Sequence, residues 1–264
     1  MNRKLLTIII LVSIILLAFI AFNIIRARAS FQVKASLLNQ AKDFEAKGNL
    51  LAAKEQYQKL ISEFPNSAEV MSWQKKVEDL NIKLLFSPTI TPKSILYEIK
   101  PGDTISKIAR DLKTTGDLIM KSNDLSDARI LPGRKIKVWT APFSILIDKS
   151  QNTLILKSDE DIIKTYIVST GKNNSTPVGT FKITNKLINP TWFKAGAVVA
   201  PSSPENVLGT RWLGFDLYGY GIHGTTDPKS LGKQVTEGCV RMSNSDVEEV
   251  YSIVPQGTEV TIVD

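Results

Sequence analysis

The hydrophobic and polar positions of this chain follow three successive patterns: one long apolar run, then helical spacing, then the alternation typical of strands. The run comes first, because Leu5 to Ile25 holds 21 residues without a charge, enough to cross a bilayer core of about 30 Å as a helix. Arg3 and Lys4 precede it, and the positive-inside rule places that end in the cytoplasm. We predict that residues 1–28 form a cytoplasmic N-terminus and a single-pass transmembrane anchor.

A cleaved signal peptide is the alternative interpretation of the same run. Ala27, Arg28 and Ala29 resemble a small-residue cleavage site, but the run exceeds the roughly 7–15 apolar residues of a signal peptide. Arg26 directly after the run also suits the end of an anchor. Under either interpretation the rest of the chain lies outside the cytoplasm, in the periplasm or the cell wall.

Helical spacing follows over residues 35–85. Apolar residues recur there at three- and four-residue steps, with a turn at Gly48 and Asn49. The stretch AKGNLLAAKEQYQKLISEFPNS resembles a tetratricopeptide repeat, yet about three such repeats are needed for a stable solenoid. We therefore predict a short α-helical stalk or spacer, with a docking surface for a partner protein as the alternative.

A small module of strand and helix patterns comes next. Residues 86–94 hold two prolines and no helical spacing, which predicts an extended linker. Residues 95–139 then show a short strand, a helix that begins after the cap residue Thr104, a second short helix, and a closing strand over Lys135 to Trp139. The predicted order is βααβ.

Strand-like alternation dominates residues 143–264. Apolar residues alternate over several short runs separated by turns, and Glu259 to Val263 is the last predicted strand. One helix near the end has an apolar face, and Ser245 with Glu248 forms a capping box at its start. We predict a multidomain chain whose last part is a mostly β domain with short helices.

Composition and charge add two constraints. The net charge of +7 fits attraction to an anionic wall or membrane surface, but there is no basic stripe interleaved with aromatic residues, so nucleic acid is not a predicted partner. The chain has one cysteine, Cys239, and one histidine, His223. An intramolecular disulfide is therefore excluded, and an exported chain keeps a lone thiol.

Cys239 and His223 lie 16 positions apart in the same predicted domain. A thiol attacks carbonyls as its thiolate, and a neighbouring imidazole can take the proton. Gly238 lets the backbone approach a substrate, where adjacent N–H groups could form an oxyanion hole, and Arg241 can hold a carboxylate. The structural alternatives are a buried cysteine that packs as a small hydrophobe and a surface ion pair at Arg241.

Other chemistries lack their motifs. A zinc site needs three or four ligands, which one histidine and one cysteine cannot supply as a motif. The sequence has neither a phosphate-binding glycine loop nor a Gly-x-Ser-x-Gly elbow. We predict no metal and no cofactor. Trp192 could line a cleft, with an aromatic core residue as the alternative.

Two family resemblances narrow the function. YEIKPGDTISKIARDL and IMKSNDLSDARILPGRKIKV, within residues 95–139, resemble a LysM module, which implies binding to N-acetylglucosamine-containing glycans such as peptidoglycan. STGKNNSTPVGTFKI, LGTRWLGF, YGIHGT and TEGCVRMSNSDVEEVYSIVPQGTEVTI, within residues 143–264, resemble the YkuD-type L,D-transpeptidase catalytic domain. The two together imply a transferase of cell-wall biogenesis that helps maintain cell shape.

The second resemblance also implies roles for particular residues. Cys239 would be the nucleophile and His223 its base, with the carbonyl of Gly224 orienting the imidazole and Arg241 positioning substrate. Many members of the family have histidine where this chain has Glu237, and the role of that carboxylate is open.

The implied reaction is acyl transfer on peptidoglycan stem peptides. The cysteine would attack the carbonyl after the third residue of a tetrapeptide stem, release the terminal D-alanine, and pass the acyl group to a neighbouring stem as a 3→3 cross-link. Water as acceptor would make the enzyme an L,D-carboxypeptidase, and a protein amine would make it a protein-to-wall anchoring enzyme. A non-catalytic peptidoglycan-binding scaffold is the alternative from another functional class.

Overall fold

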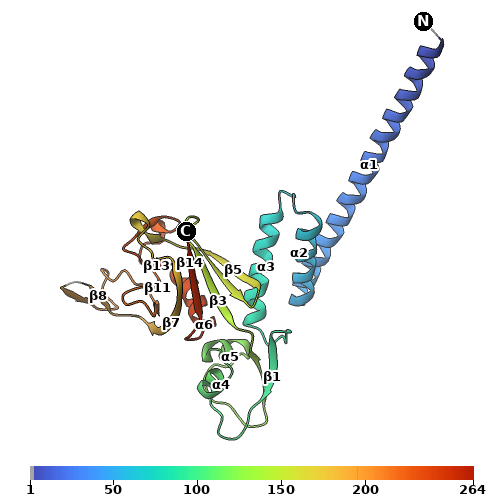
Figure 1. Ribbon diagram of the computed structural model, residues 1–264. Helices are drawn as coiled ribbons and strands as arrows, with labels where there is room; N and C mark the ends of the chain where they lie inside the picture. Colours follow the sequence, from blue (N-terminus) through green and yellow to red (C-terminus); the bar gives the residue numbers. More distant parts are fainter. Residues whose placement is uncertain (1–2, 195) are drawn as a thin grey trace. The chain divides into compact units, whose positions relative to one another are not determined.

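The computed structural model describes residues 3–194 and 196–264, and the chain forms two compact units that divide after Leu80. The first unit comprises α1 (Arg3–Ala46), α2 (Leu50–Glu63) and the first part of α3 (Val70–Leu85) (Figure 1). Residues 1 and 2 of the predicted anchor lie outside the described residues. α1 runs without a break through residues 26–35, so the apolar run and the first amphipathic segment form one helix.

The predicted anchor forms the first part of α1, whose apolar side chains are exposed. Within the described residues, α1 is the one helix that is long and apolar enough to cross a membrane, judged by length and composition alone. Leu17 and Phe19 are 65% and 64% exposed. A signal sequence would share both features, so the helix supports either interpretation of the N-terminus.

The helices predicted between residues 35 and 85 are confirmed, and a small core explains them. Tyr57 and Leu60 of α2 are buried in a cluster with apolar residues of α1 and α3. α2 begins after Asn49, whose side chain accepts a hydrogen bond from the N–H of Ala52 at 3.2 Å. That bond satisfies one of the unpaired donors of the first turn.

Residues 95–139 fold in the predicted strand–helix–helix–strand order. The elements are β1 (Ser94–Glu98), α4 (Ile105–Asp111), α5 (Gly116–Ser122) and β2 (Lys135–Trp139). β1 and β2 pair antiparallel, with Tyr97 opposite Ile136. Thr104 caps α4 as predicted, because its hydroxyl accepts the N–H of Lys107 at 3.1 Å.

The segment before β1 is packed rather than free. It holds no helix or strand from Phe86 to Lys93, as its prolines predict. Thr91 and Ser94 are nevertheless buried, and the N–H of Thr91 donates to Ser94 Oγ at 2.8 Å. Phe86 packs against the core of the last domain. Local hydrogen bonds and apolar contacts therefore hold this segment in place, although it forms no helix or strand.

The last domain is built on one eight-stranded sheet with the strand order β13-β11-β10-β7-β14-β3-β4-β5. Its strands are β3 (Phe143–Asp148), β4 (Thr153–Ser158), β5 (Asp161–Ile167), β7 (Gly179–Ile188), β10 (Arg211–Phe215), β11 (Gly221–His223), β13 (Val240–Arg241) and β14 (Glu259–Val263). α6 (Asn244–Ile253) supplies Val247 and Val250 to the core that contains Leu213 and Ile222 of the sheet. The prediction of a mostly β domain is confirmed.

α6 begins two residues earlier than the sequence predicts. Ser243 is the N-cap residue, and its hydroxyl accepts the N–H of Asp246 at 3.1 Å. The sequence offers the serine-x-x-acid pattern twice, as Ser243 with Asp246 and as Ser245 with Glu248. The capping box predicted at Ser245 is therefore wrong, because the pattern alone does not say which of the two serines is the N-cap residue of the helix.

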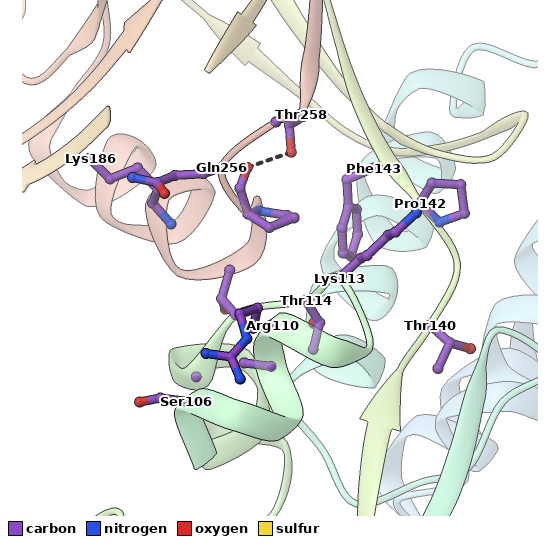
Figure 2. Close-up of a pocket in the computed structure, with 15 residues that line it drawn as sticks. Ser106, Arg110, Lys113, Thr114, Thr140, Pro142, Phe143, Lys186, Gln256 and Thr258 are labelled. Carbon is purple, nitrogen blue, oxygen red and sulfur yellow. Dashed lines mark hydrogen bonds between the residues drawn. The ribbon is translucent and has the colours of Figure 1, made fainter. Parts of the chain in front are cut away.

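A groove of about 980 Å³ lies between the βααβ module and the sheet domain (Figure 2). Arg110 and Lys113 line it from the module, and Lys186 lines it from the domain. Neither Cys239 nor His223 belongs to its lining. The groove is therefore separate from the predicted chemistry.

Lys137 of β2 binds the end of α3. Its buried ammonium donates to the carbonyls of Leu84 at 2.5 Å and Ser87 at 2.8 Å, and burial lowers its pKa to about 8. We expect Lys137→Ala to reduce the free energy of unfolding by about 2–4 kcal/mol, because two carbonyls lose a charged donor and a cavity opens. Urea denaturation of the full-length protein in detergent measures this. The control is Lys135→Ala, an exposed lysine of the same strand, expected within about 0.5 kcal/mol of wild type; equal losses would contradict the role of Lys137.

Candidate active site

The sheet edge formed by β10, β11 and β13 brings the predicted chemical residues together. β10 and β11 pair antiparallel with Trp212 opposite His223, and β11 and β13 pair parallel with His223 opposite Arg241. Opposite residues in a sheet point to the same face, so these three side chains form one row. Cys239 directly precedes β13, and the same register puts it beside Gly221, two residues before His223.

This face of the sheet is the one that α6 does not cover. Leu213 and Ile222 alternate with the residues of the row and are fully buried in the core on the α6 side. The spacings within and between strands put the Cα atoms of Cys239 and His223 about 8 Å apart. A thiol and an imidazole on one face can meet across that separation.

Thr236 holds the loop that carries the thiol. Its hydroxyl donates to the carbonyl of Cys239 at 2.6 Å and accepts the N–H of Gly238 at 3.2 Å. Gly238 has a φ of 129°, and a Cβ there would lie 2.8 Å from the ring of Tyr220. Glycine is thus required before the cysteine. Its predicted oxyanion role stays a prediction, since this N–H is engaged by Thr236.

His223 is held with one nitrogen free. The side chain is 3% exposed, and its Nδ1 lies 2.7 Å from the carbonyl oxygen of Gly224. A carbonyl only accepts, so Nδ1 carries the proton and Nε2 has the free lone pair. Asn244 fixes the following loop, because its side-chain oxygen accepts the N–H groups of Thr210 at 3.2 Å and Thr225 at 3.1 Å.

Arg241 is a half-buried cation with one buried, unsatisfied donor. Its Nη1 donates to Ser230 Oγ at 2.9 Å, whereas its Nε is buried without a hydrogen-bond partner. In the part of the chain that the structure describes, Arg241 forms no ion pair, which excludes the surface ion pair as its role there. A buried unpaired donor costs about 1–3 kcal/mol. The role of Arg241 in positioning substrate stays a prediction.

The electrostatics favour a neutral pair at rest. Burial raises the pKa of the Cys239 thiol, against the smaller lowering effects of a backbone hydrogen bond from Gly221 and the charge of Arg241. Burial also lowers the pKa of His223 to about 4, and Arg241 acts in the same direction. The Cys239 Sγ–H accordingly donates to the carbonyl of Gly219 at 3.4 Å. Both pKa directions disfavour a preformed thiolate–imidazolium pair.

Glu237 and Trp192 lie apart from the row. The Glu237 side chain is 85% exposed and pairs with Lys172 Nζ at 2.8 Å, so it faces solvent beside the thiol loop. Trp192 lies on β8 (Trp192–Lys194), which pairs with β9 (Ala197–Val199) outside the large sheet. Its predicted place in a substrate cleft stays a prediction.

Several residues that hold the site are not singled out by the sequence. Thr236 binds the backbone of Cys239, and Ser230 binds the side chain of Arg241. Asn244 binds the backbone of Thr225 after the His223–Gly224 pair, and Trp212 stacks on His223. Thr236, Asn244 and Trp212 lie inside the quoted motifs, which is a usable signal. A motif does not say which residue each side chain touches, because that depends on the strand register.

Comparison with known proteins identifies both domains. The family model of the L,D-transpeptidase catalytic domain (YkuD) matches residues 142–262, and that of the LysM domain matches residues 97–139. YkuD of Bacillus subtilis (strain 168) is 36% identical over 175 residues, which cover 64% of this chain and 98% of that protein. YqjB of the same organism is 40% identical over 126 residues, 46% of this chain and 70% of YqjB.

Solved structures of the same kind are more distant. An L,D-transpeptidase from Mycobacterium smegmatis is 22% identical, covers 51% of this chain and 65% of its own, and has a TM-score of 0.39. An L,D-transpeptidase catalytic domain preceded by a LysM domain, which implies peptidoglycan binding, places the chain among cell-wall proteins. The chain belongs to the YkuD L,D-transpeptidase family, with a LysM domain before the catalytic domain. Both sequence resemblances are confirmed. The family acts on peptidoglycan, and these domains imply an extracytoplasmic location.

Proposed function

We propose that this chain is a cysteine-dependent L,D-transpeptidase that forms 3→3 cross-links between peptidoglycan stems. The observation that supports it is the sheet edge, where the thiol of Cys239, the Nε2 lone pair of His223 and the unpaired Nε of Arg241 share one face. Acyl transfer needs these three groups: a nucleophile, a base, and a cationic site for substrate.

The first half-reaction forms a thioester. Cys239 Sγ attacks the carbonyl after the third residue of the stem while His223 Nε2 takes the thiol proton. Collapse of the tetrahedral intermediate breaks the bond to the terminal D-alanine, whose amine leaves with the proton from His223. The carbonyl of Gly224 keeps the imidazole in the required tautomer, and Arg241 holds the carboxylate of the donor stem.

The second half-reaction transfers the acyl group. The amine of a neighbouring stem attacks the thioester, His223 accepts its proton, and the thiolate of Cys239 leaves and is reprotonated. Water would give L,D-carboxypeptidase activity, and a protein amine would give protein anchoring.

The remaining segments fit a membrane-anchored wall enzyme. We propose residues 1–28 as an uncleaved anchor, since the exposed apolar side chains of α1 suit a lipid environment. Residues 35–85 then act as a spacer or as a docking surface for a partner protein, and residues 86–94 connect them to the wall-binding module over 95–139. Residues 143–264 carry the catalysis.

Incubation of the full-length protein in detergent with purified sacculi tests the proposed function. After muramidase digestion, mass spectrometry is expected to detect 3→3 dimers. Tripeptides without dimers would assign carboxypeptidase activity, and muropeptides joined to protein would assign anchoring. Sacculi that bind the protein but keep their composition would contradict an enzymatic role and leave the scaffold alternative.

A further inference from the structure

Trp212 lies against the candidate base. The ring centroids of Trp212 and His223 are 6.0 Å apart, and the ring planes are inclined by only 18°. The two residues are direct partners on β10 and β11. The backbone pairing therefore sets the stack, since opposite residues of antiparallel strands have neighbouring side chains.

The indole is fixed by contacts at its edge and beneath it. Its N–H donates to Asn185 Oδ1 on β7 at 3.0 Å. A Cβ at Gly214 would lie 2.6 Å from the indole nitrogen, and a Cβ at Gly221 would lie 2.8 Å from Cζ2. Real Cβ atoms do not approach so closely, so the indole can lie flat over these positions only because both are glycine.

The strand register places the residues on this face of the sheet in two adjacent rows that run across the strands. One row holds Trp212, His223 and Arg241; the other holds Asn185, Gly214, Gly221 and Cys239. The second row has no side chain at its two middle positions. The indole of Trp212 extends sideways from its own row and covers Gly214 and Gly221. It therefore lies beside the imidazole of His223 and over the row that contains Cys239.

We propose that Trp212 is a positioning residue, whose indole, held by Asn185, fixes the ring plane of His223 and keeps water from one face of the imidazole. The inference rests on the function proposed above, because it says what holds the base of that reaction. Gly224 fixes the imidazole at one edge through Nδ1, and a ring held at one edge can still tilt. The stacked indole removes that freedom and aims Nε2.

The test uses the fact that His223 is the only histidine of the chain. NMR of the full-length protein in detergent reads its imidazole pKa without any substrate. Trp212→Ala is expected to raise that pKa by about one pH unit or more, towards the ordinary value of about 6.5, because burial is the main cause of its lowering. The kcat for dimer formation should fall by about 10- to 100-fold with KM little changed.

Conservative variants separate positioning from bulk packing. Trp212→Phe keeps a stacked ring and should retain most of the kcat and the low pKa. Asn185→Ala removes only the anchor of the indole and should give smaller shifts in the same directions. Lys182→Ala, which changes an exposed side chain of the same strand, is the matched control and should change neither quantity.

A folded Trp212→Ala protein with the wild-type imidazole pKa and the wild-type kcat would overturn the inference. If Trp212→Ala does not fold, Asn185→Ala decides, because Asn185 is exposed and its loss leaves the core intact; unchanged pKa and kcat there would overturn the inference as well. A wild-type protein that yields no peptidoglycan product, but whose His223 pKa still rises in Trp212→Ala, would remove the proposed function and keep the role of Trp212 in holding the ring.

Discussion

Cys239→Ala is expected to abolish D-alanine release and 3→3 dimer formation while leaving binding to sacculi unchanged. The loss should reach about 10⁴-fold or more, as for removal of other enzymatic nucleophiles, because the chain has no second cysteine to replace it. Binding should survive because the LysM domain has its own buried core. Mass spectrometry of digested sacculi measures the products, and co-sedimentation with sacculi measures the binding.

Glu237→Gln is the matched control for this variant. It changes a residue two positions from the thiol but removes only an exposed charge that pairs with Lys172. An exposed ion pair contributes about 0–1 kcal/mol, so dimer formation should stay within a few-fold of wild type. Undiminished dimer yield from Cys239→Ala would rule out the cysteine mechanism. Loss of binding to sacculi would contradict the expectation that the LysM domain binds independently of Cys239.

Local patterns in the sequence locate most elements of the fold. The strand over Glu259 to Val263 and the strand over Lys135 to Trp139 are found at the predicted residues, because apolar alternation between turn residues is a local property. The cap of α6 is misplaced because two overlapping copies of one pattern compete. The packing of Phe86 against the core of the last domain has no local signal in the sequence, because it depends on residues far along the chain.

The site shows the same division between local and non-local information. Cys239 and His223 can be found as unique residues within two motifs, and the glycines around them mark tight backbone. The stack of Trp212 on His223 depends on which strands are neighbours and in which register, and a one-residue slip would send each side chain to the other face. Sequence spacing does not contain that register, so the motif that includes Trp212 does not reveal its stack on His223, and Asn185 emerges only from the fold.

His223→Gln is expected to lower kcat/KM at pH 7 by about 10²- to 10⁴-fold, the usual contribution of a general base. The thiol has a raised pKa and depends on the imidazole for deprotonation. In the variant the remaining rate should grow with pH well above 8, since only spontaneously formed thiolate reacts. Initial rates of dimer formation from pH 3 to pH 10 measure both effects; a variant as active as wild type at pH 7 would remove His223 from the reaction.

The pH dependence of the wild-type rate should reflect the lowered pKa of the buried imidazole of His223. Protonation of His223 destroys the base, so activity is lost as the pH falls through its pKa. Since burial lowers that pKa to about 4, the rate should hold from pH 7 down to about pH 5 and then fall, whereas an ordinary histidine would already be half protonated near pH 6.5. The thiol and the imidazole titrate as a coupled pair, so the limb belongs to both. If His223→Gln lacks this loss of activity at low pH, the loss belongs to the imidazole. A wild-type rate that already falls to half near pH 6.5 would mean that water reaches the imidazole ring in solution.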